Sequence, residues 1–366
     1  MVLDNLTDFQ GTYTTGTGEA LVLIPKYKLT VNRIQLALGG TTFTKAMITR
    51  IRLLMGTKPV YEVTGSDLDK INKYKRIYDD AAHLTVDFNE RDAPDIVGKE
   101  IGGYDMTQLA DPLYLKLNIS GATAPTLAGK TFYTPPQDNP LVTKLIPFSQ
   151  YFGNTGAVTL TIDPKGALLK RLFMNYTGTD WCGASATATA WTGNTGDGAM
   201  GAITVSAATK IGTYKLVIVE PGTNVGTFVI FDPDGVPISK KGAVASAFSA
   251  GGLAFTLADG ATDFAAGDGF DIVVSSNNGN LSSFEAKKNG VTIWNASCKD
   301  ARFIQQEYQR VPQSKMYVYE PIVDNNQSGA LVTADASSLE FKPTITAADT
   351  ISGYMEVLDQ PGNLSA

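Results

Sequence analysis

The sequence contains few of the side chains from which catalytic and metal sites are built. Its 366 residues include one histidine, His83, and two cysteines, Cys182 and Cys298. The cysteines stand far apart and form no CxxC-type pattern, which favours two thiols over the alternative of a disulfide. His83 has no cysteine or acid at a useful spacing, so we interpret it as a strand residue and not as a general base or metal ligand.

Long apolar runs and an excess of basic charge are also absent. No stretch approaches the roughly 20 apolar residues of a transmembrane helix, and Met1–Tyr13 lacks the basic and apolar regions of a signal peptide. The formal net charge is -6, which argues against nucleic-acid binding because that function needs a basic face. Hydrophobic residues make up 43% of the chain, enough for globular cores.

Clustered acids give a weak indication of a cation site. Asp263, Asp268 and Asp271 lie in "TDFAAGDGFD", and Asp232 and Asp234 lie in "DPDG". These carboxylates are hard oxygen ligands of the kind calcium prefers, but they lack the spacing of a calcium loop. Aspartate next to glycine is common in tight turns, so turn formation is the favoured interpretation.

Three other motifs also have a plain structural interpretation. The glycine-rich stretches Gly16–Leu21 and Gly193–Gly201 precede strands, whereas a phosphate-binding loop opens a helix. The basic cluster Lys70–Arg76 fits a solvated helix face; its alternatives are contact with an acidic neighbouring subunit or with lipid headgroups. The sequence therefore predicts no catalytic, cofactor-binding or metal-binding residue.

The chain contains two copies of one unit. Gly18–Gly40 and Gly156–Gly178 each begin with a short alternating run, pass through Ile, Pro and Lys, and continue into a second apolar run. That second run carries Arg33 in the first copy and Arg171 in the second, at an offset of 138. Repeats of this kind predict repeated supersecondary structure.

Two further comparisons extend the repeat. Ile51–Arg76 and Phe284–Arg310 each read as strand, tight turn, strand and short helix, at an offset of 234 from turn glycine to turn glycine. Ser66 is the expected N-cap of the first helix. "LYLKLNIS" (Leu113–Ser120) matches "LEFKPTIT" (Leu339–Thr346) at an offset of 226.

The jump in offset from 138 to 234 places about 96 extra residues in the second copy, the size of a small domain. Residues 183–279 hold 16 of the 36 glycines, no arginine, four lysines and eight acids. An insertion between two strands leaves and returns at nearly the same point and is tolerated at exposed loop tips. We therefore expect an acidic, solvent-facing inserted β-domain.

These observations predict an all-β fold. Each copy supplies about eight strands, expected in the first copy near 19–25, 29–38, 47–55, 59–64, 84–89, 101–106, 113–119 and 130–134. Eight antiparallel strands in two sheets form a jelly roll. The prediction is two tandem eight-stranded jelly rolls, a double jelly roll, with one short helix each and a small β-domain inserted in a loop of the second roll. The expected boundaries are 1–134 for the first roll, 135–145 for a linker, 146–180 and 280–366 for the second roll, and 181–279 for the insertion.

Two rolls in tandem, each with a helix after its central hairpin, resemble the double jelly-roll major capsid proteins of tailless icosahedral bacteriophages with an internal membrane, of the corticovirus and tectivirus type. The resemblance implies a structural virion protein of the capsid shell, not an enzyme. It implies a homotrimer that forms a pseudo-hexameric capsomer and meets neighbouring capsomers. Penton or minor capsid proteins and an internal lipid membrane are further implied partners.

The insertion resembles the small β modules of lambda-type head decoration proteins, on "GTYKLVIVEPGTNVGTFVIFDPDG" and "FTLADGATDFAAGDGFDI". That resemblance implies a position on the outer surface, with host surface or neighbouring capsomers as partners. The alternative is a phage tail or receptor-binding adhesin that stacks carbohydrate on Trp181 and Trp191, although tryptophans at a domain junction are more often packing residues. A glycoside hydrolase on a jelly roll needs paired carboxylates on facing strands, and the sequence shows no such pair.

Overall fold

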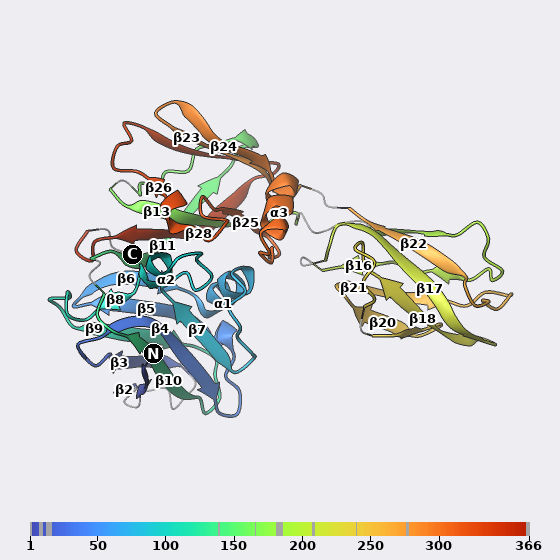
Figure 1. Cartoon of the computed structure of the whole chain (residues 1–366), viewed down its shortest axis with the longest axis horizontal. Helices are drawn as coiled ribbons and strands as arrows, with labels where there is room; N and C mark the ends of the chain where they lie inside the picture. Colours follow the sequence, from blue (N-terminus) through green and yellow to red (C-terminus); the bar gives the residue numbers. More distant parts are fainter. Residues whose placement is uncertain are drawn as a thin grey trace.

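The chain forms two β-rolls lying one above the other and a third, smaller β unit that projects from them (Figure 1). The computed structural model describes residues 2–6, 10–11, 17–137, 140–164, 166–180, 186–206, 209–238, 240–275 and 278–363. Within these ranges, no helix combines the length and the apolar character needed to cross a membrane.

The first roll packs two sheets of alternating strands. In β9, for example, every second residue of "LYLKLNI" is buried, as expected of a strand with one face on a core. One sheet has the order β1-β10-β4-β7 and the other the order β2-β3-β9-β5-β6, with β8 beside β4. Their bounds are β1 (Val2–Leu6), β10 (Thr126–Thr134), β4 (Thr30–Gly39), β7 (His83–Asp87), β8 (Tyr104–Asp105), β2 (Gln10–Gly11), β3 (Gly18–Leu23), β9 (Leu113–Ile119), β5 (Ile48–Met55) and β6 (Lys58–Val63).

The second roll repeats this strand order, except that β2 has no counterpart among the described strands. Its sheets run β11-β28-β13-β25 and β12-β27-β23-β24, with β26 beside β13. The bounds are β11 (Val142–Phe152), β28 (Asp349–Asp359), β13 (Leu168–Asn175), β25 (Met316–Tyr319), β26 (Leu331–Val332), β12 (Gly156–Ala157), β27 (Leu339–Ile345), β23 (Leu281–Lys288) and β24 (Val291–Ser297). The predicted double jelly roll is confirmed, and β11 begins inside the range 135–145 that the sequence suggests as a linker.

Pairing registers fix which residues correspond in the two rolls. Arg33 faces Phe132 across β4 and β10, and Arg171 faces Glu356 across β13 and β28, each next to a bulge. The predicted offset of 138 is therefore confirmed for this strand, and Phe132 corresponds to Glu356. Leu117 of β9 corresponds to Pro343 of β27, which confirms the offset of 226.

Each roll has one ten-residue helix after its hairpin, α1 (Gly65–Tyr74) and α3 (Cys298–Glu307). Thr64 and Ser297 cap them, so the expectation of Ser66 as N-cap is wrong. The shared cap sets the offset here at 233, one less than the turn glycines suggest. The reason is that Gly56, with φ 60°, occupies the same turn position in the first hairpin as Asn289, with φ 53°, occupies in the second. Gly290 occupies the next position of its turn. A shorter helix, α2 (Ile96–Glu100), has no predicted counterpart.

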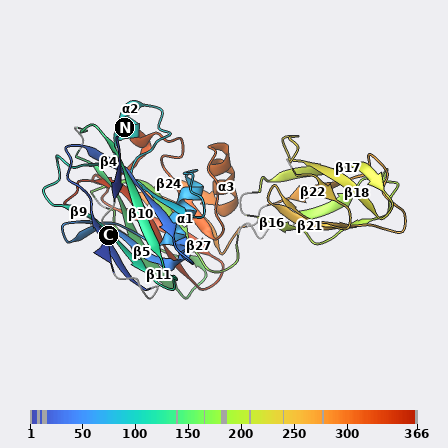
Figure 2. The ribbon, with the colours of Figure 1, turned by 90° about the horizontal axis from the view of Figure 1, so that it is seen from below.

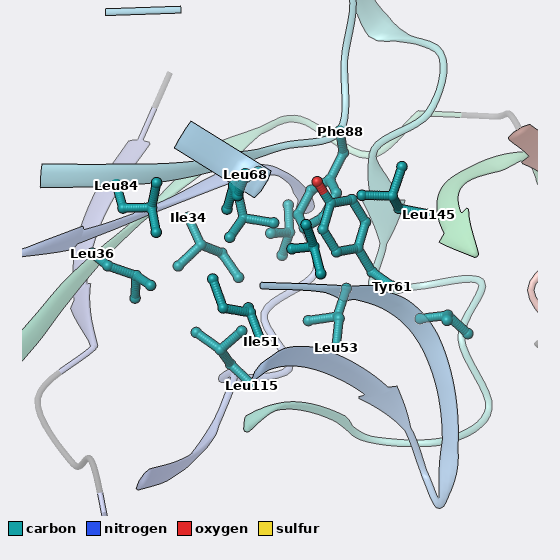
Figure 3. Packing of buried hydrophobic residues seen from close by; sticks show 14 of the residues in the cluster. Ile34, Leu36, Ile51, Leu53, Tyr61, Leu68, Leu84, Phe88, Leu115 and Leu145 are labelled. Atoms are coloured by element: carbon teal, nitrogen blue, oxygen red, sulfur yellow. The ribbon is translucent and has the colours of Figure 1, made fainter. Parts of the chain in front are cut away.

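The rolls are joined through their sheets. β6 of the first roll and β11 of the second pair in parallel, with Tyr61 opposite Leu145. Leu145 lies beside Tyr61 and Phe88 in the core of the first roll (Figure 3). Because Phe173 and Tyr354 of the second roll belong to the same buried cluster, apolar packing continues from one roll into the other.

The third unit, here called the inserted unit, connects β13 to β23 and has a separate hydrophobic core. The chain leaves and re-enters the second roll at adjacent points, since the Asn280 backbone N–H donates to the Thr179 carbonyl at 2.6 Å. It extends away from both rolls next to α3 (Figure 2). Its two sheets contain β14 (Ala186–Ala190), β22 (Gly269–Val274), β17 (Gly212–Gly222), β18 (Val225–Phe231) and β19 (Gly242–Ala243) in one, and β15 (Ala199–Met200), β21 (Leu253–Ala258), β16 (Thr204–Val205) and β20 (Ala247–Ala250) in the other.

Candidate functional site: the charged seam between the rolls

The single histidine lies at the start of β7, as predicted for a strand residue. The His83 side chain is 42% exposed, and its Nδ1 lies 2.8 Å from Oδ1 of Asp80, so the expectation that no acid is placed near His83 is wrong. This hydrogen bond lowers the pKa of Asp80. Within the described parts of the chain, no three His, Cys, Asp or Glu side chains gather as metal ligands.

Asp268 and Asp232 of the inserted unit hold turns together, as the turn interpretation predicts, whereas Asp271 lies within strand β22. Asp268 accepts hydrogen bonds at 2.9 Å from the backbone N–H groups of Thr195, Gly196 and Ala265. Burial alone would raise the pKa of Asp268, but these donors lower it. Asp232 likewise accepts from the backbone N–H groups of residues 234 and 236 in its own turn.

The glycine-rich stretch Gly193–Gly201 therefore wraps a carboxylate of its own chain and opens no helix. A Cβ on Gly198 would lie 2.4 Å from the Phe264 ring, so the close approach requires glycine. Trp191, a candidate sugar platform, is half-buried and donates from Nε1 to Asp271 at 2.9 Å. This hydrogen bond supports the packing interpretation; Trp181 and Cys182 lie outside the described residues.

The other cysteine is a buried thiol. Cys298 begins α3, is free and is 3% exposed. Burial raises the pKa of its thiol to about 12, so the thiolate that would react or bind metal is suppressed at neutral pH.

The prediction that the basic cluster Lys70–Arg76 forms a solvated helix face is only partly right. Lys73 is 58% exposed, as a solvated face requires. Lys75 is only 6% exposed and is not solvated; its Nζ lies 2.9 Å from Glu356 and 3.7 Å from Glu90. The acidic partners of this cluster are therefore found within the same chain.

Lys75 belongs to a buried network, the charged seam, that crosses from one roll to the other. Arg171 is its centre: its guanidinium binds Glu90 of the first roll and both Glu320 and Glu356 of the second, at 2.5–2.8 Å. Lys170 adds a 2.6 Å contact to Glu90. No member has a side chain more than 6% exposed; the seam comprises Lys75 and Glu90 from the first roll and Lys170, Arg171, Arg310, Glu320 and Glu356 from the second.

Neighbouring charges overcome the cost of burial in this network. Burial alone would raise the pKa of Glu356, but Lys75, Lys170 and Arg171 bring it down to about 2. The same kind of balance, with Arg171 as the main cation, holds the pKa of Glu90 well below its ordinary value. All three glutamates lie against buried cations. Removing any one charge would therefore leave its partners buried with less charge compensation and without water to solvate them.

The seam also has an uncharged part. Tyr74, the last residue of α1, donates its hydroxyl to Glu320 at 2.6 Å and packs edge-on against Phe173. The side chains of the seam pair with one another across the two rolls and so fix the position of one roll against the other. Sequence reasoning missed it, although Lys170 and Arg171 interrupt an otherwise apolar strand and so carried a signal.

Comparisons with known proteins agree with this architecture. The family profile described as viral coat protein P2 N-terminal domain matches residues 4–134, and the profile described as viral coat protein P2 C-terminal domain matches residues 253–361. The chain belongs to the viral coat protein P2 family. The two profiles match in the order N-terminal then C-terminal and together cover about two thirds of the chain. The C-terminal match begins inside the inserted unit.

Solved structures show the same fold for this coat protein. The major capsid protein P2 of bacteriophage PM2 is 12% identical, with a TM-score of 0.59, over 99% of this chain and 100% of that chain. The major capsid protein of Sulfolobus Turreted Icosahedral Virus is also 12% identical, with a TM-score of 0.52, over 98% and 96%. The PBCV-1 virus capsid gives 11% identity and a TM-score of 0.50 over 98% and 93%. No curated protein sequence matches the chain.

Proposed function

We propose that this coat protein is the major capsid subunit of an icosahedral shell and that three chains form one pseudo-hexameric capsomer. The observation that carries the proposal is the order of eight corresponding strands that the two rolls of one chain share. Three such chains present six similar lobes, which suit a nearly six-fold lattice. A closed ring of this kind uses the same two surfaces at every contact between chains.

The position and the charge of the inserted unit support its assignment to the outer surface of the shell. It projects from the side of the rolls on which α1 and α3 lie (Figure 1), so it leaves the lateral faces of the rolls clear for neighbours. With four lysines against eight acids in 183–279, its surface is acidic and suited to solvent. We assign it to the outer surface, as a module of 181–279 that binds host surface or clamps neighbouring capsomers.

Assembly, not turnover, is the proposed work of the chain. The expected partners are copies of itself, neighbouring capsomers, penton or minor capsid proteins and an internal lipid membrane, with no direct contact to nucleic acid. The net charge of -6 agrees with the last point.

Light scattering on the purified chain tests the capsomer directly. The expected mass is three times that of one chain, and negative-stain images should show a hexagonal outline with three projections, one per inserted unit. A stable monomer at micromolar concentration would contradict the proposal. A tail adhesin would instead bind glycans as a free protein, so a glycan array on the same sample separates the alternative.

A further inference from the structure

We propose that the open edge of β24 receives β1 of a second copy of this chain, in the register in which β6 receives β11 within one chain. The inference rests on the proposed function, because it names the surfaces through which the copies meet. It is carried by the repeat itself, since one roll shows an occupied contact and the other shows its vacant counterpart.

β24 is an edge strand. It pairs with β23 on one side and, among the described residues, with no strand on the other. Its counterpart β6 pairs with β5 and also with β11 of the second roll. Exposed edges are ready templates for another strand, and β24 carries no lysine, proline or acid that would protect it.

Side chains of β24 are more exposed than the corresponding side chains of β6. Val60, the bulged residue of β6, is 1% exposed, whereas its counterpart Ile293, the bulged residue of β24, is 40% exposed. Tyr61 is 4% exposed, and its counterpart Trp294 is only half-buried. The second roll thus keeps apolar side chains at positions that only a neighbour would cover.

β1 is the matching strand. It pairs with β10 as β11 pairs with β28, and Leu3 opposite Phe132 corresponds to Leu145 opposite Glu356. The other edge of β1 pairs with no strand in the described parts of the chain. Because Leu145 lies opposite Tyr61 in parallel pairing, the repeat places Leu3 of the second copy opposite Trp294.

The correspondence between the two rolls also predicts which residues surround the strand contact between chains, and these residues are aromatic where those within the chain are charged. Within the chain, Lys75 pairs with Glu356, and Glu356 also accepts a hydrogen bond from Arg171. Between chains, the corresponding residues are Tyr308, which is 45% exposed, and Phe132, over whose ring Arg33 lies with its guanidinium carbon 3.8 Å from the centroid. A charged seam inside the chain therefore becomes an aromatic contact between chains, stabilised by cation–π attraction.

Two lysine substitutions on β24 test the edge. Ile293→Lys places a charge at a position that the second copy would bury, and we expect the concentration for half-dissociation of the trimer to rise about 100-fold. Val291→Lys is the matched control. Val291 is 65% exposed, and the corresponding residue of the first roll is already a lysine, Lys58. Assembly of this variant should therefore be unchanged. Equal assembly of the two variants would overturn the proposal.

A rescue experiment tests the aromatic contact. Tyr308→Lys places a second cation beside Arg33 of the neighbour and should weaken the trimer about tenfold. Adding Phe132→Glu to the same chain rebuilds between chains the pair that Lys75 and Glu356 form within one, and should restore assembly. Thermal unfolding of each variant, diluted to the monomer, checks that the rolls remain folded; a double variant weaker than Tyr308→Lys alone would contradict the contact.

Crosslinking distinguishes a wrong interface from a wrong function. A cysteine at Ile293, combined in turn with one at position 2, 3 or 4, should give disulfide-linked dimers and trimers on non-reducing gels. Val236→Cys, 56% exposed on the inserted unit, is the control partner and should give none. A trimer without these crosslinks would overturn this interface and leave the proposed function standing; a wild-type monomer would overturn both.

Discussion

The guanidinium of Arg171 holds the carboxylate of Glu90 in two parallel hydrogen bonds, Nη1 to Oε1 at 2.6 Å and Nη2 to Oε2 at 2.8 Å. The two residues are 81 positions apart and belong to different rolls. Bidentate pairs of this kind fix orientation as well as distance. The pair therefore fixes the orientation of one roll against the other at this contact.

Arg171→Met should destabilise the chain by about 3–5 kcal/mol, because it leaves three buried glutamates with fewer cations. Urea unfolding at pH 7 measures the change. Arg50→Met is the control, since Arg50 pairs with Glu62 while 48% exposed, and it should cost less than about 1 kcal/mol. Equal losses in the two variants would show that the seam contributes no more than a surface pair.

Acid should weaken the coat protein through Glu356. The pKa of this carboxyl is about 2 in the folded chain against an ordinary 4.5, so the unfolded chain takes up the proton first as the pH falls. Through this carboxyl alone, the free energy of unfolding should drop by about 3 kcal/mol between pH 5 and pH 2, and Glu90, whose pKa is also lowered, adds to the loss. Urea titrations across this window measure the slope.

Glu356→Gln should reduce that slope, leaving the part that Glu90 contributes, and should lower stability at pH 7. Glu340→Gln is the comparison, because the pKa of Glu340 is lowered by Lys342 at the exposed surface, where solvent screens the pair. It should keep nearly the full slope. A wild-type slope in Glu356→Gln would assign the acid sensitivity to other groups.

Deleting 183–279 should leave both rolls folded. Their two hydrophobic clusters contain no residue of the inserted unit, and Thr179 and Asn280 already meet at 2.6 Å. Circular dichroism and light scattering should show a folded chain of unchanged oligomeric state. Aggregation of the shortened chain would show that the rolls depend on the inserted unit, to which the buried Arg302 donates a hydrogen bond at the Thr209 carbonyl.

Cys298 should resist thiol reagents in the folded chain, since it is 3% exposed and its pKa is raised to about 12. In a Cys182→Ser variant, the single remaining thiol should react with Ellman's reagent about 1,000-fold more slowly in buffer than in 6 M guanidinium, where the thiol regains its ordinary acidity. Rapid reaction in buffer would mean that α3 opens readily from the second roll.

Much of the fold was readable from the sequence because a duplicated chain carries its own internal comparison. The offsets of 138 and 226 survive in the strand registers, and the excess of residues in the second copy falls between β13 and β23. The helix offset was wrong by one, because a glycine in a turn does not reveal which turn position it occupies. Asn289 takes the left-handed conformation that Gly56 takes in the first copy.

The sequence by itself determined the strand alternation, the duplication and the place of the inserted unit, since each follows from short local patterns and from comparing those patterns between two stretches of the chain. Only the tertiary structure decided which charges are buried. Lys75 lies two residues after the exposed Lys73, yet its side chain is buried against Glu90 and against Glu356, which is 281 positions away. The vacant edge of β24 likewise became visible only when two corresponding strands, one covered and one open, were compared in space.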